Sequence, residues 1–255
     1  MKRKLIAVIG PTASGKTSLA IKIAKKLNGE LINADSRQIY KYMDIGTAKG
    51  DVKKIRNSKL KTLEIYQIEG VPIHLINIVA PDEVLTLAQY QKLAYATIDH
   101  IAKRGKLPIL VGGTGLYVDA VVKGYKIPKV KPDMRLRGRL DSKTVSYLQN
   151  ILKKLNKNQF DSLNESDKKN KHRLIRLIEL VKNTKDSKRK LSEAPEFDVL
   201  FLTPAYTRDG LYETINRRAK IILKSGLIDE VKGLIKKGFK FTKPAMTAIS
   251  YPIVK

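Results

Sequence analysis

The chain has no cysteine and no tryptophan among its 255 residues. Without cysteine, a disulfide scaffold, a thiolate metal site and a cysteine nucleophile are excluded. Only three histidines are present, so a histidine-rich metal centre is not expected. No apolar run approaches the roughly 20 residues that a membrane span requires, and the run near the N-terminus is too short for a secretory signal. We therefore expect a cytoplasmic protein with no membrane partner.

Acidic residues are scarce. The chain has 24 Asp and Glu against 51 Lys and Arg, which gives a formal net charge of +27. Such an excess is typical of proteins that bind nucleic acid, although a lysine-rich solvated surface is the alternative. Residues 1–122 carry 19 basic and 10 acidic side chains, and residues 123–255 carry 32 and 14. We expect the anion-binding surface to favour the second part.

Hydrophobic residues make up 42% of the chain, enough for a buried core. Short apolar runs rich in β-branched residues alternate with segments of helical periodicity. This alternation predicts an α/β fold with a doubly wound parallel sheet, in which ligands bind at the carboxyl ends of the strands. The expected buried strands are 5–9, 30–34, 107–111 and 197–202, and the expected helices are 18–27, 86–103, 208–224 and 227–237.

The pattern changes between Pro128 and Pro195, where strand-like runs disappear and charged helical segments dominate. Leucine and isoleucine recur at helical spacing over 148–155 and 174–181. We therefore predict a helical insertion over 128–195. Residues 1–127 form the first part of the α/β core, and residues 196–255 complete it.

A glycine-rich motif follows the first predicted strand. The segment GPTASGKT fits the pattern G-x-x-x-x-G-K-[ST] between a strand and a helix, the context that makes it specific. Backbone N–H groups and the helix N-terminus attract phosphate there, Lys16 can reach terminal phosphate oxygens, and the Thr17 hydroxyl can bind Mg²⁺. The motif predicts a site for a phosphorylated small molecule, formed by Gly10, Pro11, Thr12, Ala13, Ser14, Gly15, Lys16 and Thr17.

Two further strands end in polar or glycine residues. Asp35 follows the strand at 30–34, and GGTGLY at 112–117 follows the strand at 107–111. A carboxylate at Asp35 could bind Mg²⁺ through water, act as a general base, or cap the next helix. The glycines allow close approach to a ligand, or form an ordinary strand-to-helix turn. We expect Gly10, Asp35 and Gly112 to meet at one edge of the sheet.

Several longer segments follow one another in a fixed order. GPTASGKT precedes DSRQIY at 35–40, MDIGTAK at 43–49, VGGTGLY at 111–117, HRLIR at 172–176 and GLIDEV at 226–231. Together with Glu179 and Arg218, this combination resembles the tRNA isopentenyl transferase (tRNA dimethylallyltransferase) family over nearly the whole chain. The resemblance implies a P-loop NTPase-like core with an inserted helical domain that helps to grip the anticodon stem-loop of tRNA.

The resemblance also implies a reaction. The family transfers a dimethylallyl group from dimethylallyl diphosphate to the exocyclic amino nitrogen of the adenosine just 3′ of the anticodon. Lys16, Arg218 and Mg²⁺ at Thr17 would then neutralise the departing diphosphate, with Thr12 nearby. Asp35 would be the general base for an adenine that has left its stack. We expect the protein to act as a monomer.

The resemblance implies tRNA contacts around the reacting base at 36–38 and at further positions along the chain. For the basic residues, the alternative is nonspecific phosphate contact, and for Arg137 and Arg139 it is a solvated helix face. The implied tRNA-binding residues are Asp35, Ser36, Arg37, Gln38, Thr114, Arg135, His172, Arg173 and Arg176.

The sequence departs from the family pattern at two places. Ile73 stands before His74 where the family usually has a polar residue, often histidine. At 246–252 the chain reads MTAISYP instead of a pattern close to MQAIGYK, so Thr247, Ser250 and Pro252 differ. Family members usually continue with further helices. We expect this C-terminally shortened end to affect tRNA affinity more than diphosphate binding.

Two other functions fit part of the sequence. A small-molecule kinase or NTPase would use the same phosphate loop, with the insertion as a lid. However, no hydrophobic strand ends in a convincing metal-binding carboxylate, because the strand at 107–111 ends in glycines. A catalytically inactive tRNA-binding relative would explain the altered C-terminus, but such a protein would not need Lys16, Thr17, Asp35 and Arg218 together.

Overall fold

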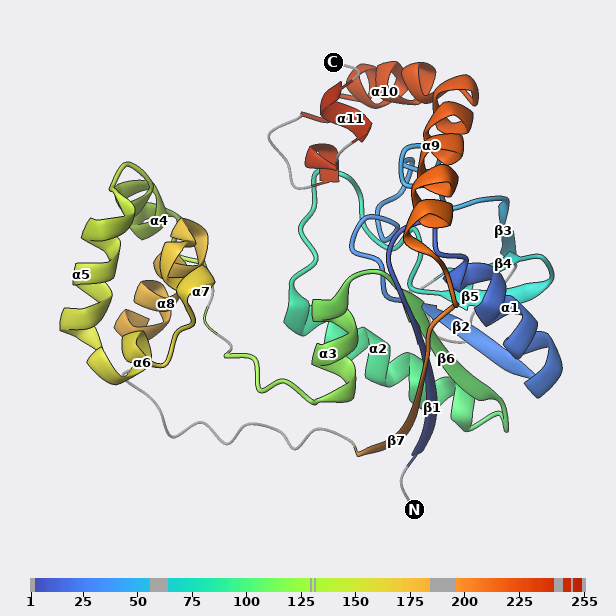
Figure 1. The fold of residues 1–255 in the computed structure, drawn as a ribbon, viewed down its shortest axis with the longest axis horizontal. Coiled ribbons are helices and arrows are strands. Elements are labelled where there is room, and N and C mark those ends of the chain that lie inside the picture. Colours follow the sequence, from blue (N-terminus) through green and yellow to red (C-terminus); the bar gives the residue numbers. More distant parts are fainter. Residues whose placement is uncertain are drawn as a thin grey trace. The chain divides into compact units, whose positions relative to one another are not determined.

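The computed structural model describes residues 3–55, 64–128, 130, 132–183, 196–240, 245–248 and 250–253. The chain divides into two compact units, Met1–Tyr125 with Ala194–Lys255, and Lys126–Glu193. Figure 1 shows the course of the chain through both. The last part of the predicted insertion, residues 184–195, lies outside the described residues.

A sheet of seven described strands forms the centre of the first unit, in the order β3-β4-β5-β2-β6-β1-β7. Neighbouring strands from β5 to β7 are parallel, whereas β3, β4 and β5 pair antiparallel. The predicted α/β fold with a parallel sheet is confirmed. The strands are β1 (Arg3–Ile9), β2 (Gly29–Asn33), β3 (Val52–Ile55), β4 (Ile65–Ile68), β5 (Val71–His74), β6 (Leu107–Gly112) and β7 (Phe197–Leu202).

Burial separates the central strands from β7. All of β2 and most of β6 are buried, and the continuous apolar run of β6 predicts this burial. The expectation of a buried strand at 197–202 is wrong as regards burial, because among the described strands β7 pairs only with β1 and so lies at a sheet edge. Leu200 and Phe201 are 55% and 47% exposed there.

Helices cover both faces of this sheet (Figure 1). On one face, α1 packs against Ile6, Leu31 and Ile109, and on the other, α2 and α3 pack with Ile32 and Leu110. Predicted helices 86–103, 208–224 and 227–237 match the observed ones within a residue. The helices of this unit are α1 (Lys16–Leu27), α2 (Leu87–Ala102), α3 (Gly115–Val122), α9 (Arg208–Lys224), α10 (Leu227–Lys236), the 3₁₀ turn η1 (Ala245–Thr247) and α11 (Ser250–Ile253).

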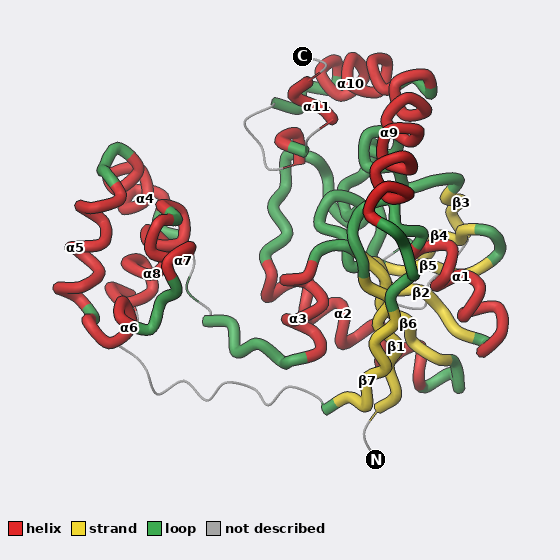
Figure 2. The backbone as a smooth tube through the Cα atoms, viewed as in Figure 1, coloured by secondary structure: helices red, strands yellow, loops and turns green. Residues whose placement is uncertain are grey.

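The described part of the second unit contains helices and no strand, as Figure 2 shows. Leu148, Leu152, Leu174 and Ile178 are fully buried in its core, on the two helix faces that the sequence predicts. Side chains of Asp133, Thr144, Asn156 and Asn164 cap four of its helices. The helices are α4 (Met134–Asp141), α5 (Val145–Leu155), α6 (Lys157–Asp161), α7 (Glu165–Lys169) and α8 (Lys171–Asn183).

The carboxyl ends of β1, β2 and β6 meet at one edge of the sheet. Ile9 pairs with Gly112, and Asn33 pairs with Val111. The backbones are so close that a β-carbon added to Gly112 would lie 2.1 Å from the carbonyl oxygen of Ala34. Only glycine fits there, since the neighbour is backbone and cannot turn aside.

We predict that Gly112→Ala destabilises the first unit by about 1–3 kcal/mol, the usual cost of overpacking. A β-carbon at this position must push β6 away from the backbone after β2. Urea unfolding would measure the change. Gly115→Ala is the matched control, because nothing lies within 4 Å of an added β-carbon there. Equal stability of the two variants would contradict the close approach.

Candidate functional site

The phosphate loop runs from Gly10 to Thr17, between β1 and α1. Helix α1 begins at Lys16, two residues before the predicted start, directly after Gly15 in a left-handed conformation with φ of 84°. The Lys16 ammonium donates a hydrogen bond of 3.0 Å to the Pro11 carbonyl across the loop. The hydroxyl oxygen of Ser14 is buried and has no hydrogen-bond partner in the structure. The loop therefore holds a polar group that a bound anion would satisfy.

The glycine segment after β6 lies against this loop. A β-carbon on Gly113 would lie 3.6 Å from the Lys16 ammonium nitrogen and 3.7 Å from the Gly10 carbonyl oxygen. Glycine at this position therefore keeps the space beside the ammonium open. The structure therefore brings the predicted motifs GPTASGKT and VGGTGLY together.

Asp35 follows β2 at the same edge of the sheet. Its carboxylate oxygen Oδ1 accepts a hydrogen bond of 2.8 Å from the Arg37 backbone N–H. Residues 36–39 form turns and not a helix, so the predicted alternative of a helix cap is wrong, and the carboxylate closes a turn. No described hydrogen bond uses its other oxygen, which leaves that oxygen available to a substrate.

The buried side chain of Asn33 orients the turn that begins at Asp35. Its side-chain oxygen accepts from the Asp35 backbone N–H at 3.2 Å, and its amide donates to the Leu75 carbonyl at 3.1 Å. The Tyr90 hydroxyl donates to the Asn33 carbonyl at 3.0 Å. Buried Asn33, with hydrogen-bond partners in three segments of the chain, fixes the direction in which Asp35 leaves the sheet.

Thr114 joins the Asp35 turn to the glycine segment. The Thr114 hydroxyl oxygen accepts from the Ser36 backbone N–H at 2.9 Å and donates to the Ser36 hydroxyl at 3.2 Å. Its backbone N–H donates to the Ala34 carbonyl at 3.1 Å. Two residues with implied tRNA contacts are thus adjacent, 78 positions apart in sequence.

Arg218 on α9 reaches the same site. Its guanidinium donates a hydrogen bond of 3.1 Å to the Ala48 carbonyl. Gln38 donates to the Thr47 carbonyl at 3.2 Å, so this side chain supports the 43–49 loop in the described structure. The predicted motif MDIGTAK therefore contacts α9 at Arg218.

The pKa shifts of Lys16 and Arg218 show that these two cations share one electrostatic environment with the Asp35 carboxylate. Burial lowers the pKa of Lys16, the Asp35 carboxylate opposes that shift, and the Arg218 charge adds to it. Burial likewise lowers the pKa of Arg218, and Asp35 opposes that shift. Two partly desolvated cations therefore face a single carboxylate. Such an arrangement favours a bound anion, which would supply the missing negative charge.

Glu179 organises the cations of the second unit. Its fully buried carboxylate accepts from Arg137 Nε at 2.9 Å and Nη2 at 2.8 Å, and it also pairs with Arg176. Burial alone would raise the pKa of Glu179, but the two arginines and the Asp133 backbone N–H lower it to about 2. The alternative of a solvated helix face is therefore wrong for Arg137.

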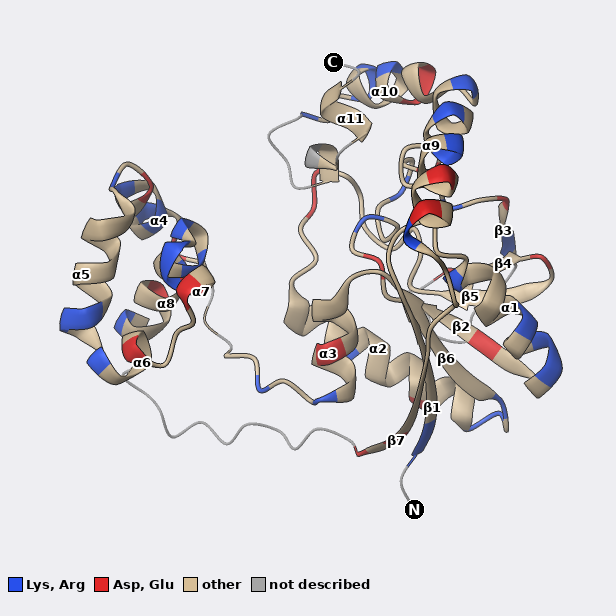
Figure 3. Cartoon of the chain, in the orientation of Figure 1, with Lys and Arg blue, Asp and Glu red and all other residues tan. Residues whose placement is uncertain are grey.

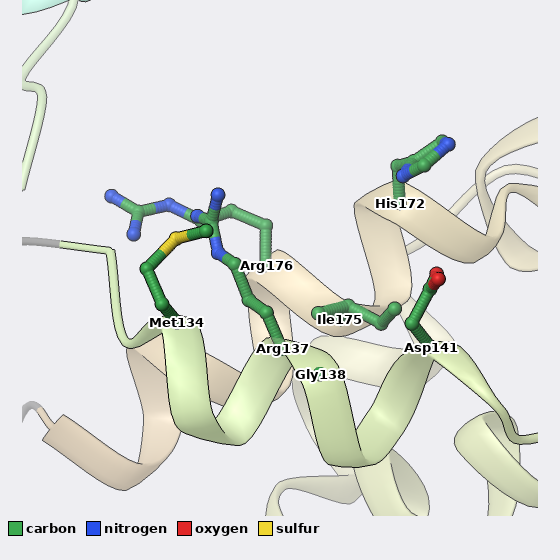
Figure 4. Close-up of a pocket in the computed structure, with 7 residues that line it drawn as sticks. All are labelled: Met134, Arg137, Gly138, Asp141, His172, Ile175 and Arg176. Atoms are coloured by element: carbon green, nitrogen blue, oxygen red, sulfur yellow. The ribbon is translucent and has the colours of Figure 1, made fainter. Parts of the chain in front are cut away.

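A cavity of about 400 Å³ lies beside this ion pair (Figure 4). Two residues with implied tRNA contacts, His172 and Arg176, line it, together with Met134, Arg137, Gly138, Asp141 and Ile175. Two others lie outside it, since Arg135 is exposed on α4 and Arg173 pairs with Asp167. The second unit therefore presents fixed guanidinium groups next to exposed ones.

Basic side chains occur in both units of the structure. Lys and Arg are spread over the helices of the second unit and over α9 and α10 (Figure 3). Among the described helices, none is both long and apolar enough to cross a bilayer. Within the same described residues, no group of three or more His, Asp or Glu side chains could hold a metal ion.

Comparisons with known proteins identify relatives over nearly the whole chain. A family model described as IPP transferase matches residues 38–254. The tRNA dimethylallyltransferase of Carboxydothermus hydrogenoformans is 39% identical, over 98% of this chain and 78% of that protein. The tRNA dimethylallyltransferase of Acetivibrio thermocellus is 37% identical, over 97% of this chain and 77% of that protein.

Solved structures agree with the sequence matches. A full-length tRNA isopentenylpyrophosphate transferase from Bacillus halodurans superimposes with a TM-score of 0.63 at 36% identity, over 99% of this chain and 76% of that one. A eukaryotic dimethylallyltransferase acting on tRNA gives a TM-score of 0.69 at 27% identity, over 92% and 56%. With a family model that spans most of its residues and relatives this similar, the chain belongs to the IPP transferase family.

Proposed function

We propose that this protein transfers a dimethylallyl group from dimethylallyl diphosphate to the exocyclic amino nitrogen of the adenosine next to the anticodon in tRNA. The observation that carries the proposal is the meeting of Lys16, Asp35 and Arg218 in one partly buried site. A kinase is not favoured, because β6 ends at Gly112 without a metal-binding carboxylate. The named relatives, which are tRNA dimethylallyltransferases, support the same reaction.

The diphosphate would bind at the phosphate loop. Lys16 and Arg218 would lie on its oxygens, and the unpartnered Ser14 hydroxyl would donate a hydrogen bond to it. As the bond between the allylic carbon and the diphosphate oxygen breaks, its electron pair leaves with the diphosphate. Fixed cations in a partly desolvated site stabilise that growing charge more than water does.

Mg²⁺ fits this site. It prefers few protein ligands and completes its shell with phosphate oxygens and water, in agreement with the absence of a carboxylate cluster among the described residues. The Thr17 hydroxyl would hold it, at the start of α1. When bound, the ion would add positive charge beside the diphosphate.

Asp35 would accept the proton of the adenine amino group. The nitrogen forms a bond to the allylic carbon and loses a proton. This proton would pass to Oδ2 of Asp35, the oxygen that does not accept the Arg37 backbone N–H. Asn33 holds the turn so that this oxygen can face the acceptor. The nucleotides around the reacting base would be contacted by the neighbouring residues Ser36, Arg37 and Gln38 and by Thr114, which is hydrogen-bonded to Ser36.

The second unit would bind the anticodon stem-loop. The exposed arginines Arg135 and Arg173 would contact phosphates, together with His172 and Arg176 at the rim of the cavity. This assigns the tRNA-binding role to the insertion of residues 128–195. We also propose that the protein acts as a monomer, which light scattering of the complex with tRNA would test.

Asp35→Asn should abolish most turnover while tRNA still binds. Removal of a general base typically lowers the rate by about 10²–10⁴-fold. Incubation with dimethylallyl diphosphate, Mg²⁺ and an anticodon stem-loop, followed by mass analysis of the RNA, measures the transfer. Asp51→Asn, an exposed acid of the same charge, is the control. A normal rate in Asp35→Asn would remove the general-base assignment.

Lys16→Ala should weaken dimethylallyl diphosphate binding and lower the transfer rate by about 10²–10³-fold, the usual loss for one preorganised donor on a developing charge. Affinity for tRNA should stay within about twofold, because the ammonium faces the phosphate loop. Calorimetry measures the first and filter binding the second. Lys26→Ala, exposed at the end of α1, removes the same charge elsewhere. If both variants bound the donor equally, Lys16 would not contact it.

Arg173→Ala should weaken tRNA binding and lower the slope of log affinity against log salt by about one unit, as expected for one lost phosphate contact. Binding of the anticodon stem-loop at several salt concentrations gives the slope. Lys103→Ala, exposed after α2, should leave it unchanged. An unaltered slope in Arg173→Ala would show that this side chain contacts no phosphate.

A further inference from the structure

A carboxylate on α10 holds the beginning of the 43–49 loop. Glu230 Oε2 accepts from the backbone N–H groups of Asp44 and Ile45, both at 2.8 Å, and Oε1 accepts from that of Gly46 at 3.0 Å. The Tyr251 hydroxyl on α11 donates to Oε1 at 2.7 Å. Four donors on one carboxylate form a strong, directional anchor, because charge-assisted hydrogen bonds are about twice as strong as neutral ones.

The same loop is closed from the other side by Lys49. Its ammonium is buried and donates to the Tyr40 carbonyl at 2.5 Å, the Asp44 carboxylate at 2.7 Å and the Asn77 side-chain oxygen at 2.6 Å. Since an ammonium has three donors, these bonds use all of them. Lys49 therefore stabilises the loop and is not available to a phosphate.

Close packing leaves the loop little freedom. A β-carbon on Gly46 would lie 2.6 Å from the Tyr251 ring, and the Ser250 hydroxyl donates to the Gly46 carbonyl at 2.7 Å. Within the loop, the N–H groups of Ala48 and Lys49 donate to the carbonyls of Ile45 and Asp44. A displacement at 44–46 would therefore be passed on to Ala48.

Ala48 links the loop to the anion site, because its carbonyl accepts from the Arg218 guanidinium at 3.1 Å. We infer that Glu230 is a positioning residue for Arg218: it fixes the 43–49 loop so that the Ala48 carbonyl holds the guanidinium at the diphosphate. This inference rests on the proposed function. An arginine with one donor already fixed loses less side-chain freedom when it binds a phosphate.

Glu230→Gln tests this role. The amide keeps one acceptor oxygen but loses the charge and the second acceptor. We expect affinity for inorganic pyrophosphate with Mg²⁺, and kcat/KM for dimethylallyl diphosphate, to fall roughly tenfold. Affinity for the stem-loop should be unchanged. Asp229→Asn is the matched control, since this exposed neighbour on α10 makes no described hydrogen bond to the loop. A normal pyrophosphate affinity in Glu230→Gln would overturn the inference.

A double-mutant cycle separates positioning from general stability. If Glu230 acts through Arg218, Glu230→Gln should add no further loss of pyrophosphate affinity to Arg218→Gln. Additive losses would overturn the inference. If Glu230→Gln does not fold, Tyr251→Phe removes one of the four bonds, and a roughly twofold to threefold loss of pyrophosphate affinity is expected. An unchanged pyrophosphate affinity in Tyr251→Phe would count against Glu230 as the anchor of the 43–49 loop.

The pyrophosphate measurement also distinguishes this inference from the proposed function. If the wild-type protein bound pyrophosphate but modified no stem-loop, the proposed function would fail. The positioning role would still be decided by the loss of pyrophosphate affinity in Glu230→Gln.

Discussion

Two partly buried cations near one carboxylate are the constraint on which the site depends. Lys16 and Arg218 both lose hydration, and each lowers its pKa as a result. Asp35 opposes both shifts but supplies only one negative charge. The protein must therefore hold these groups against their mutual repulsion, and the fold does so with backbone carbonyls: Pro11 accepts from Lys16 and Ala48 accepts from Arg218. The proposed diphosphate would relieve the repulsion that remains.

The sheet explains how three distant segments meet at this point. Parallel strands β1, β2 and β6 end at one edge, so the loops after them are neighbours without any long-range adjustment. Gly112 permits the backbones after β2 and β6 to touch, and Gly113 keeps space beside the Lys16 ammonium. Since α9 follows β7 at the same side of the sheet, Arg218 enters from a fourth segment. The geometry of the site is thus a consequence of strand order and of two glycines.

Much of this arrangement could be predicted from the sequence, and the limits have physical reasons. Continuous apolar runs predict β1 and β6, because a strand buried on both faces needs them, and the segment 30–34 was predicted as a short strand. Strands β3, β4 and β5 were not predicted. For β3, which reads VKKI, the exposed lysines hide any apolar run. The role of Glu230 was also missed. Its partners are backbone N–H groups 184 to 186 residues away, and no side-chain pattern records such contacts.

The net charge of the chain overstates the number of cations that are free to bind RNA. Lys49 donates all three of its hydrogen bonds to groups within the protein, namely the Tyr40 carbonyl, Asp44 and Asn77. Arg104 and Lys106 pair with buried Glu30, and Arg137 and Arg176 pair with buried Glu179. These side chains contribute to the formal charge of +27 but are engaged within the protein. For Arg137 and Arg176 the engagement has a second effect, because guanidinium groups held by a buried carboxylate keep a fixed direction at the cavity rim. An excess of basic residues therefore indicates a polyanionic partner, while the buried acids determine which of those residues can meet it.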